Sequence, residues 1–381
     1  MNILEKISDR FSKVTPLPEG TYHLQATQDE KPYRLHLRLR ADGSGLLILN
    51  ASTVLQLNPT AAEYAYHFIK GTAPEEAAEQ VSKRYRVDKK TALADFANFT
   101  DQIHTLISTP DLDPASFLGF ERVAPYSARG ASTLRLDCAL TYRLPERTSA
   151  EHAPVKRVDR ELNTEEWQII MDKAWQAGIP HIIFTGGEPT LREDLPQLIA
   201  HAEKNGQVCG LLTDGLKLAD KDYLETLLQT GLDHVMLILQ PNDPRSWKAI
   251  ETIVPQDLFL TVHFTLTQEN VEDAKHILQK LANLAVENIS LSAADSDLLD
   301  ELLELQDTAN SLRLAIRWDL PVPYSAANPV AIETVDDEIP AGAGKAWMYV
   351  EPDGDVLPAQ GEADKVMGNF LRDEWDVIHK N

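Results

Sequence analysis

Two stretches decide the fold: Leu134-Arg-Leu-Asp-Cys-Ala-Leu-Thr-Tyr-Arg143 and His181-Ile-Ile-Phe-Thr-Gly-Gly-Glu-Pro-Thr-Leu-Arg192. Each begins with a short, mostly apolar run that is typical of a buried strand. Between them, Asn163-Thr-Glu-Glu166 has the N-cap and the N3 glutamate of a helix start, and Gly178 marks the helix end. A strand, a helix and a second strand in this order favour two parallel strands joined by a crossover.

The same alternation continues beyond residue 192. Strands are predicted over 208–213, 234–239, 260–266, 288–291 and 312–318, with helices between them. Repeated βα units favour a parallel sheet with right-handed crossovers. Six or seven such units fit a partial TIM barrel better than a closed barrel of eight. In the acidic stretch 295–307 we expect one solvated helix face, with Leu298, Leu299, Leu302 and Leu303 pointing inward.

A strand ending in Tyr142-Arg143, followed by Phe184-Thr-Gly-Gly-Glu-Pro-Thr-Leu-Arg192, resembles the core of radical S-adenosylmethionine (SAM) enzymes. The resemblance implies a partial (β/α) barrel over 132–320. In that family the Tyr-Arg pair is followed by three cysteines that hold a 4Fe–4S cluster. The matching positions here are Leu144, Thr148 and Glu151. Because such clusters are held by thiolates, we expect this chain to bind no iron–sulfur cluster.

The turn after the second strand carries the candidate site. In the radical SAM family it receives the amino group of the SAM methionine, through backbone oxygens and the acidic side chain. The resemblance therefore implies SAM as a cofactor, with Glu188 facing its ammonium in a polar cavity at the barrel mouth. The candidate cofactor-binding residues are Gly186, Gly187, Glu188, Pro189, Thr213 and Asp214, with Thr185 beside them. A second interpretation stays open, a tight turn whose glycines serve packing alone.

The C-terminal segment carries a second set of missing cysteines. Met348-Tyr-Val-Glu-Pro-Asp-Gly354, Met367-Gly-Asn-Phe-Leu371 and Glu374-Trp375 resemble the SPASM or twitch extension, which holds an auxiliary cluster. Ala341 and Ala359 stand where that pattern has cysteines. Pro352-Asp-Gly354 predicts a hairpin turn. We therefore expect 335–381 to form a β-hairpin and a helix without metal.

The first hundred residues are predicted to form a separate winged-helix domain of α+β type. Tyr33-Arg-Leu-His-Leu-Arg-Leu-Arg40 alternates polar and apolar residues, and further strands are expected over 46–49 and 54–57. Three helices follow, with Asp88 capping the third. Leu57-Asn-Pro-Thr-Ala-Ala-Glu63 and Val81-Ser-Lys-Arg-Tyr-Arg-Val-Asp88 resemble PqqD-like domains. The resemblance covers 15–108 and implies capture of a peptide as an added strand, although the domain could instead only pack on the barrel.

Composition limits the partners. Of 381 residues, 36 are Lys or Arg and 59 are Asp or Glu, so the formal net charge is −23. This balance argues against nucleic acid and against an anionic membrane surface. No apolar run reaches membrane-spanning length and the start of the chain lacks a signal-peptide core, so we expect a cytoplasmic protein. The segment 109–131 is rich in turn formers and is predicted to be a linker.

Other constellations are interpreted as structural. Glu146, Glu151 and His152 share one polar loop and are expected to be solvated rather than to bind metal. Cys138 and Cys209 make no metal-binding pattern and are expected to be buried thiols. His263 lies on a predicted strand and is expected to be a hydrogen-bonded core histidine. No catalytic residue is assigned.

Two functions therefore stay open. The first is a non-catalytic accessory or scaffold protein that presents a peptide to a modifying enzyme. The second is an enzyme of peptide maturation that uses SAM or another small ligand at the barrel mouth, without cluster chemistry of its own or with ligands from a partner.

Overall fold

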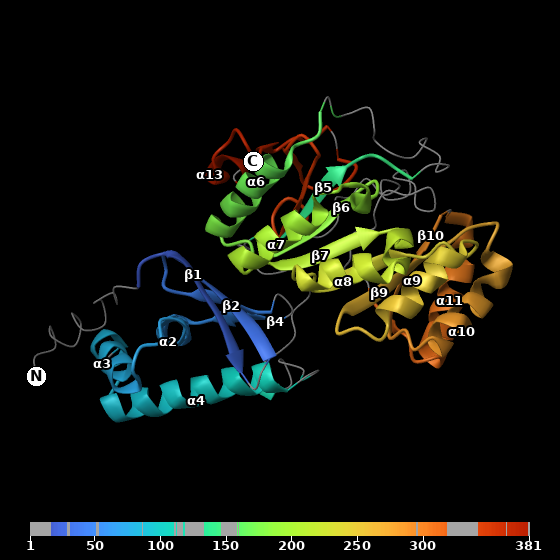
Figure 1. Ribbon diagram of the computed structural model, residues 1–381. Helices are drawn as coiled ribbons and strands as arrows, with labels where there is room; N and C mark the ends of the chain where they lie inside the picture. Colours follow the sequence, from blue (N-terminus) through green and yellow to red (C-terminus); the bar gives the residue numbers. More distant parts are fainter. Residues whose placement is uncertain are drawn as a thin grey trace, which may run out of the picture. The chain divides into compact units, whose positions relative to one another are not determined.

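A computed structural model describes residues 17–28, 31–50, 53–85, 87–109, 112, 117–118, 133–145, 158, 160–294, 296–317, 342–362 and 364–379. The chain divides into two compact units, Met1–Val123 and Ala124–Asn381. Each unit has its own sheet and its own hydrophobic core (Figure 1). The division falls inside the segment predicted as a linker, most of which lies outside the described residues.

The N-terminal unit is an antiparallel sheet followed by three helices, as the winged-helix prediction requires. Its strands are β1 (Gly20–Gln28), β2 (Lys31–Leu39), β3 (Gly45–Leu49) and β4 (Thr53–Leu57), paired in that order. Its helices are α2 (Pro59–Ile69), α3 (Pro74–Tyr85) and α4 (Lys89–Ser108). Asn58 caps α2 and Asp88 caps α4, each through a side-chain oxygen that accepts a backbone N–H of the first turn.

Helix α2 lies close against the sheet and is tied to α3. A Cβ at Gly45 would lie 2.8 Å from the Cβ of Ala62, so only glycine allows strand and helix to approach this closely. The side chain of Glu63 on α2 is 1% exposed and forms an ion pair with Arg84 on α3, with 2.8 Å between Oε2 and Nε. His67 lies on the other side of the same carboxylate, at 3.6 Å. A buried carboxylate held in this way fixes the two helices relative to each other.

We expect residues 15–108, produced alone, to fold. Their core contains Leu35, Leu37, Leu39 and Ile103 and is built from elements within this segment. The far-ultraviolet circular dichroism spectrum of the fragment should show helix and strand, and its thermal unfolding should be cooperative. A disordered spectrum would mean that the segment is no independent domain.

Ten strands in the described part of the C-terminal unit form one sheet, in the order β11-β10-β9-β8-β7-β6-β5-β12-β13-β14. The parallel strands of the barrel are β5 (Arg135–Thr141), β6 (His181–Gly186), β7 (Val208–Thr213), β8 (His234–Ile238), β9 (Phe259–Leu266), β10 (Asn288–Ala293) and β11 (Ala315–Ile316). On the other side of β5 lie β12 (Trp347–Val350), β13 (Asp355–Leu357) and β14 (Gly368–Asn369). Strand β12 pairs in parallel with β5, and β13 then returns antiparallel as the predicted hairpin.

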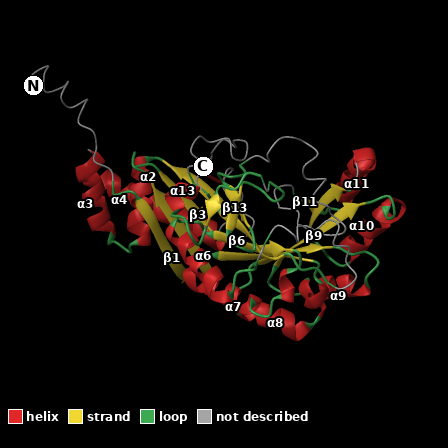
Figure 2. Cartoon of the chain, turned by 90° about the horizontal axis from the view of Figure 1, so that it is seen from above, coloured by secondary structure: helices red, strands yellow, loops and turns green. Residues whose placement is uncertain are grey.

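The helices of this unit cover one face of the curved sheet (Figure 2). They are α6 (Thr164–Gln176), α7 (Leu195–Asn205), α8 (Lys221–Gln229), α9 (Pro244–Ile253), α10 (Ala274–Asn283), α11 (Leu299–Ser311) and α13 (Trp375–Ile378). The short 3-10 turns are η2 (Pro189–Leu191), η3 (Leu216–Ala219), η4 (Val271–Asp273) and η5 (Ser296–Leu298). Asn163 and Glu166 form the predicted capping box at the start of α6. Within the described residues, no helix combines the length and apolar character needed to cross a bilayer.

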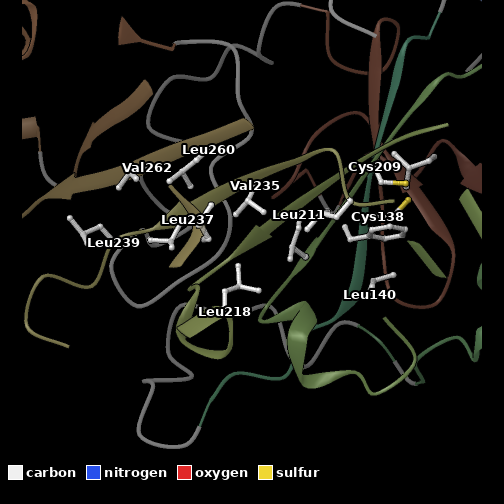
Figure 3. Close-up of a cluster of buried hydrophobic side chains, with 14 of the residues drawn as sticks. Cys138, Leu140, Cys209, Leu211, Leu218, Val235, Leu237, Leu239, Leu260 and Val262 are labelled. Atoms are coloured by element: carbon white, nitrogen blue, oxygen red, sulfur yellow. The ribbon is translucent and has the colours of Figure 1, made fainter. Parts of the chain in front are cut away.

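The core between sheet and helices contains both cysteines. Figure 3 shows Cys138 on β5 and Cys209 on β7 among buried leucines and valines of the neighbouring strands. Both thiols are free and fully buried. Burial, with a smaller contribution from Asp137, raises the pKa of the Cys138 thiol. The expectation of two buried thiols is confirmed.

Two details of the sequence analysis were wrong. Of the four leucines expected to point inward, Leu298 is buried in η5 and Leu302 is partly buried against the core, as predicted, whereas Leu299 and Leu303 are 53% and 59% exposed. The inward face of α11 contains Leu305 and Ala309 in their place. The strand predicted over 312–318 is reduced to the two residues of β11, because Leu312 still caps α11.

Candidate functional site

The sheet register brings the predicted site residues together. Strands β6 and β7 are parallel neighbours, with Phe184 opposite Leu211, and their carboxyl ends therefore reach the same rim of the barrel. The turn that follows β6 carries Gly187, Glu188 and Pro189, and β7 ends at Thr213, followed by Asp214. All five of these residues are buried, and Asp214 is 8% exposed.

The two glycines allow the turn to touch the end of β5. Gly186 has a φ of +125°, and a Cβ there would overlap the carbonyl oxygen of Thr141. A Cβ on Gly187 would overlap the carbonyl oxygen of Arg143. The amide of Gly187 donates to Thr141 O at 2.7 Å, and that of Glu188 donates to Arg143 O at 2.9 Å. Contact between two strand ends is therefore sufficient to require both glycines.

Glu188 is held entirely by groups of its own chain. Its side chain is 2% exposed. Oε1 accepts from the amide and hydroxyl of Thr190, at 2.9 and 2.5 Å, and from the Thr213 hydroxyl at 2.7 Å. Oε2 accepts from the backbone amide of Asp214 at 2.7 Å. A ligand ammonium that reached Glu188 would have to share or displace these donors, so this carboxylate first of all ties the β6 turn to the end of β7.

Asp214 lies beside Glu188 and has fewer partners. The described hydrogen bond to its side chain comes from the amide of Leu216, at 2.9 Å to Oδ1. Burial and the neighbouring Glu188 charge raise the pKa of Asp214 to about 8, although Arg245 works in the opposite direction. A carboxyl group that is protonated near neutral pH is a common feature of functional sites.

Arg192 is a residue of the same motif whose role the sequence analysis missed. Arg192 is 7% exposed, and its guanidinium donates to the carbonyl oxygens of Leu140 and Leu162 at 3.1 and 2.8 Å. It also forms two hydrogen bonds with Asp194, at 2.8 and 2.6 Å. Arg192 therefore joins the end of β5, the start of α6 and the start of α7. An arginine after a strand-end turn is the only sequence signal for this role, and it is weak.

Further polar contacts surround the end of β5. The Thr141 hydroxyl donates to Glu161, and the Arg143 guanidinium lies 3.6 Å from the same carboxylate. The Tyr142 hydroxyl donates to Glu351 at 3.0 Å, and both side chains are buried. These contacts join segments far apart in the chain, so no local pattern pointed to them.

The residues present do not fit a 4Fe–4S cluster. The chain has only two cysteines, one fewer than the three that the family motif uses, and both lie under the helices. Leu144 is partly buried and follows the end of β5, whereas Thr148, Glu151 and Ala341 lie outside the described residues. Ala359 is 3% exposed. We therefore derive no step through a cluster bound by this chain.

The remaining acidic, histidine and cysteine side chains form no described metal site. In the part of the chain that the structure describes, no group of three or more His, Cys, Asp or Glu side chains could hold a metal ion. Glu146, Glu151 and His152 lie outside that part. His263 is fully buried and hydrogen-bonds Ser290 at 3.0 Å and Ser292 at 3.1 Å, which confirms its interpretation as a core histidine.

The parallel, partly closed barrel places the protein among the α/β barrel proteins. Its buried Glu188 and Asp214 lie at the carboxyl ends of the strands, where proteins of this class bind their ligands. Comparison with known proteins gives the family. A model described as the radical SAM superfamily matches residues 138–263. Over 252 residues the chain is 33% identical to a PqqA peptide cyclase of Granulibacter bethesdensis, covering 58% of this chain and 65% of that protein. A PqqA peptide cyclase of Streptomyces rochei is 30% identical over 249 residues, which cover 58% and 67% of the two chains.

The chain belongs to the radical SAM superfamily. It spans 65% of the length of the first of these relatives, slightly under two thirds. Among solved structures, SuiB of Streptococcus suis bound to the precursor peptide SuiA has a TM-score of 0.61 at 14% identity, covering 93% of this chain and 88% of SuiB. SuiB bound to S-adenosylmethionine gives 0.59 at 16% identity, covering 91% and 87%. At these identities the likeness shows a shared fold, which extends over both units.

Proposed function

We propose that this protein acts in peptide maturation, binding SAM or a related amino-acid-containing ligand at the rim formed by β6 and β7, without a cluster held by its own thiolates. The observation that carries the proposal is the rim itself. Gly186, Gly187, Glu188 and Pro189 lie at the carboxyl end of β6 and in the turn after it, and Glu188 accepts hydrogen bonds from Thr213 and Asp214 at the carboxyl end of β7. Ligands of such folds bind at these strand ends.

The comparisons favour an enzyme over a scaffold. The curated relatives are named as peptide cyclases, and the SuiB structures contain SAM or a precursor peptide. The accessory function is supported by a different observation, namely the lack of cysteines at the cluster positions. Glycines that serve strand contact alone would also be retained in a scaffold.

We further propose that the N-terminal unit, of PqqD-like type, receives the peptide. Among the described residues, its sheet ends in two edge strands, β1 and β4, whose outer sides pair with no further strand. An extended peptide can add to such an edge through main-chain hydrogen bonds. The segment 335–381 is proposed to be a SPASM-like extension that has become a hairpin without metal.

The test combines two measurements on the full-length protein. Calorimetric titration with SAM should give saturable binding, which separates the enzyme proposal from the scaffold. Anaerobic reconstitution with iron and sulfide should leave the protein colourless, without thiolate-to-iron absorption. Failure to bind SAM would favour the accessory function, and about four irons per chain with visible absorption would overturn the cluster-free proposal.

A further inference from the structure

The two carboxyl groups at the rim are held differently. Glu188 accepts four hydrogen bonds spread over both oxygens, so both of its oxygens act as acceptors. The Asp214 side chain accepts a hydrogen bond from Leu216 and contacts the Glu188 carboxylate itself, and the Asp214 amide donates to Glu188. Two negative charges in one buried place repel each other, so the less well-held group is the one that keeps a proton.

The cations around this pair are engaged elsewhere. The charged and titratable neighbours are Glu188 on the β6 turn, Lys217 on η3, Tyr223 on α8 and Arg245 on α9. The Lys217 amino group donates to Thr190 O at 3.0 Å and lies 4.2 Å from the ring centroid of Tyr223. Arg245 is 65% exposed and forms an ion pair with Asp243 at 2.7 Å. Asp214 therefore has no dedicated counter-cation among the described residues.

A second, independent feature points to a ligand. The Thr185 side chain is 1% exposed, and in the described part of the chain its hydroxyl has no hydrogen-bond partner. On β6 it alternates with Phe184, which faces the helices, and so lies on the same sheet face as Ile183 and Leu212. Asp214 directly follows the end of the neighbouring strand β7. A buried hydroxyl without a partner is costly unless a ligand or water completes it.

We propose that Asp214, rather than Glu188, is the residue that opposes a ligand's primary ammonium group, and that it carries a proton while the site is empty. On binding, the carboxylic O–H bond breaks and the proton leaves to solvent. The resulting carboxylate accepts an N–H from the ligand ammonium. No other bond changes. The ammonium step rests on the proposed function, whereas the protonation of the empty site does not.

The first test is calorimetric titration of full-length protein with SAM at pH 7, in phosphate and in Tris buffer. Because the pKa of Asp214 is about 8, close to one proton should be released per SAM bound, and the Kd should fall about tenfold per pH unit between pH 6 and 7. 5′-Methylthioadenosine, which lacks the ammonium, should bind without proton release. In Asp214→Asn, SAM should bind more weakly, without release and with little pH dependence. SAM binding to the wild type without proton release would overturn the proposal, and this measurement needs no variant.

The second test needs no ligand. In the folded state Asp214 has a raised pKa, so the folded protein binds more protons than the unfolded chain between about pH 4 and pH 8. The thermal midpoint of the wild type should therefore fall relative to that of Asp214→Asn as the pH rises from 5 to 8.5. If the thermal midpoints of the wild type and Asp214→Asn differ by the same amount at every pH, Asp214 holds no proton in the folded protein. If SAM does not bind at all, the ammonium step fails with the proposed function, and the pH comparison alone decides the protonation.

Discussion

Replacing Arg192 by Met should lower the free energy of unfolding of the C-terminal unit by about 3–5 kcal/mol, the usual cost of breaking a buried ion pair from one side. The guanidinium donates to two backbone carbonyls and to both oxygens of Asp194. Methionine fills part of the volume but replaces none of these donors. Asp194, which also accepts from Thr164 at 2.6 Å, would be left with an uncompensated charge.

Tryptophan fluorescence during urea unfolding is a suitable measurement. All six tryptophans, from Trp167 to Trp375, belong to the C-terminal unit, so the signal reports that unit by itself. Arg160→Met is the matched control. Arg160 also binds a carboxylate through two nitrogens, because its Nη1 and Nη2 donate to the Glu166 oxygens at 2.7 and 2.8 Å. The Arg160 side chain, however, is 56% exposed. An exposed pair should contribute only about 0–1 kcal/mol. Equal losses in both variants would contradict the role assigned to Arg192.

The residues of the Gly-Gly-Glu-Pro motif and the following Arg192 have structural roles in the barrel. Glu188 ties β6 to β7, and Arg192 ties β5 to the starts of α6 and α7. Both glycines are required by contact with the end of β5. Most of the motif is therefore explained by packing of the barrel, and a chain without cluster cysteines can keep it for that reason alone. Of its neighbours, Asp214 is the one whose environment packing does not explain.

The sequence predicted the barrel because each βα unit is encoded locally. Apolar runs and helix caps, such as the box of Asn163 and Glu166, need no distant partner. Strand β1 was missed because it is an edge strand without a fully buried residue and without strong alternation over most of its length. The parallel pairing of β12 with β5 was missed because it joins Trp347 to Arg135, across more than half of the chain.

The candidate site was predictable in part for the same reason. Parallel strands end at one rim, so the residues after β6 and β7 had to lie together, and they do. The local sequence does not show which groups donate hydrogen bonds to the Glu188 carboxylate, because Thr213 and Asp214 reach it only in the folded sheet. The contact of Tyr142 with Glu351 depends likewise on the distant strand β12.

Lowering the pH from 7 to 5 should make a histidine pair at the amino-terminal ends of β6 and β8 destabilise the C-terminal unit. His181 and His234 meet across Gly210 of β7, where a Cβ would overlap the His234 ring. Their Nε2 atoms are 2.6 Å apart, so one ring donates and the other accepts. Burial lowers the pKa of His234 to about 4, and burial, His234 and Arg135 together hold the pKa of His181 well below its usual range.

The sign follows from proton binding. Between about pH 4 and 6.5 the unfolded chain binds more protons at His234 than the folded protein does, so stability is lost as the pH falls through this window. At pH 5 the loss from His234 alone is about 2 kcal/mol. Asp214 has a pKa raised to about 8 and acts in the opposite direction by a comparable amount, so it offsets the contribution of His234 in the wild type.

The effect is isolated by comparing pH slopes rather than absolute stabilities. His234→Gln keeps a side chain that can hydrogen-bond His181 but does not titrate. Its free energy of unfolding, from tryptophan fluorescence in urea, should fall by about 2 kcal/mol less than that of the wild type between pH 7 and pH 5. His276→Gln, at an exposed position of α10, should keep the wild-type slope. If His234→Gln and His276→Gln show the same slope, the buried pair takes up its proton without cost to the fold, and the short contact across Gly210 must then tolerate a charged imidazole.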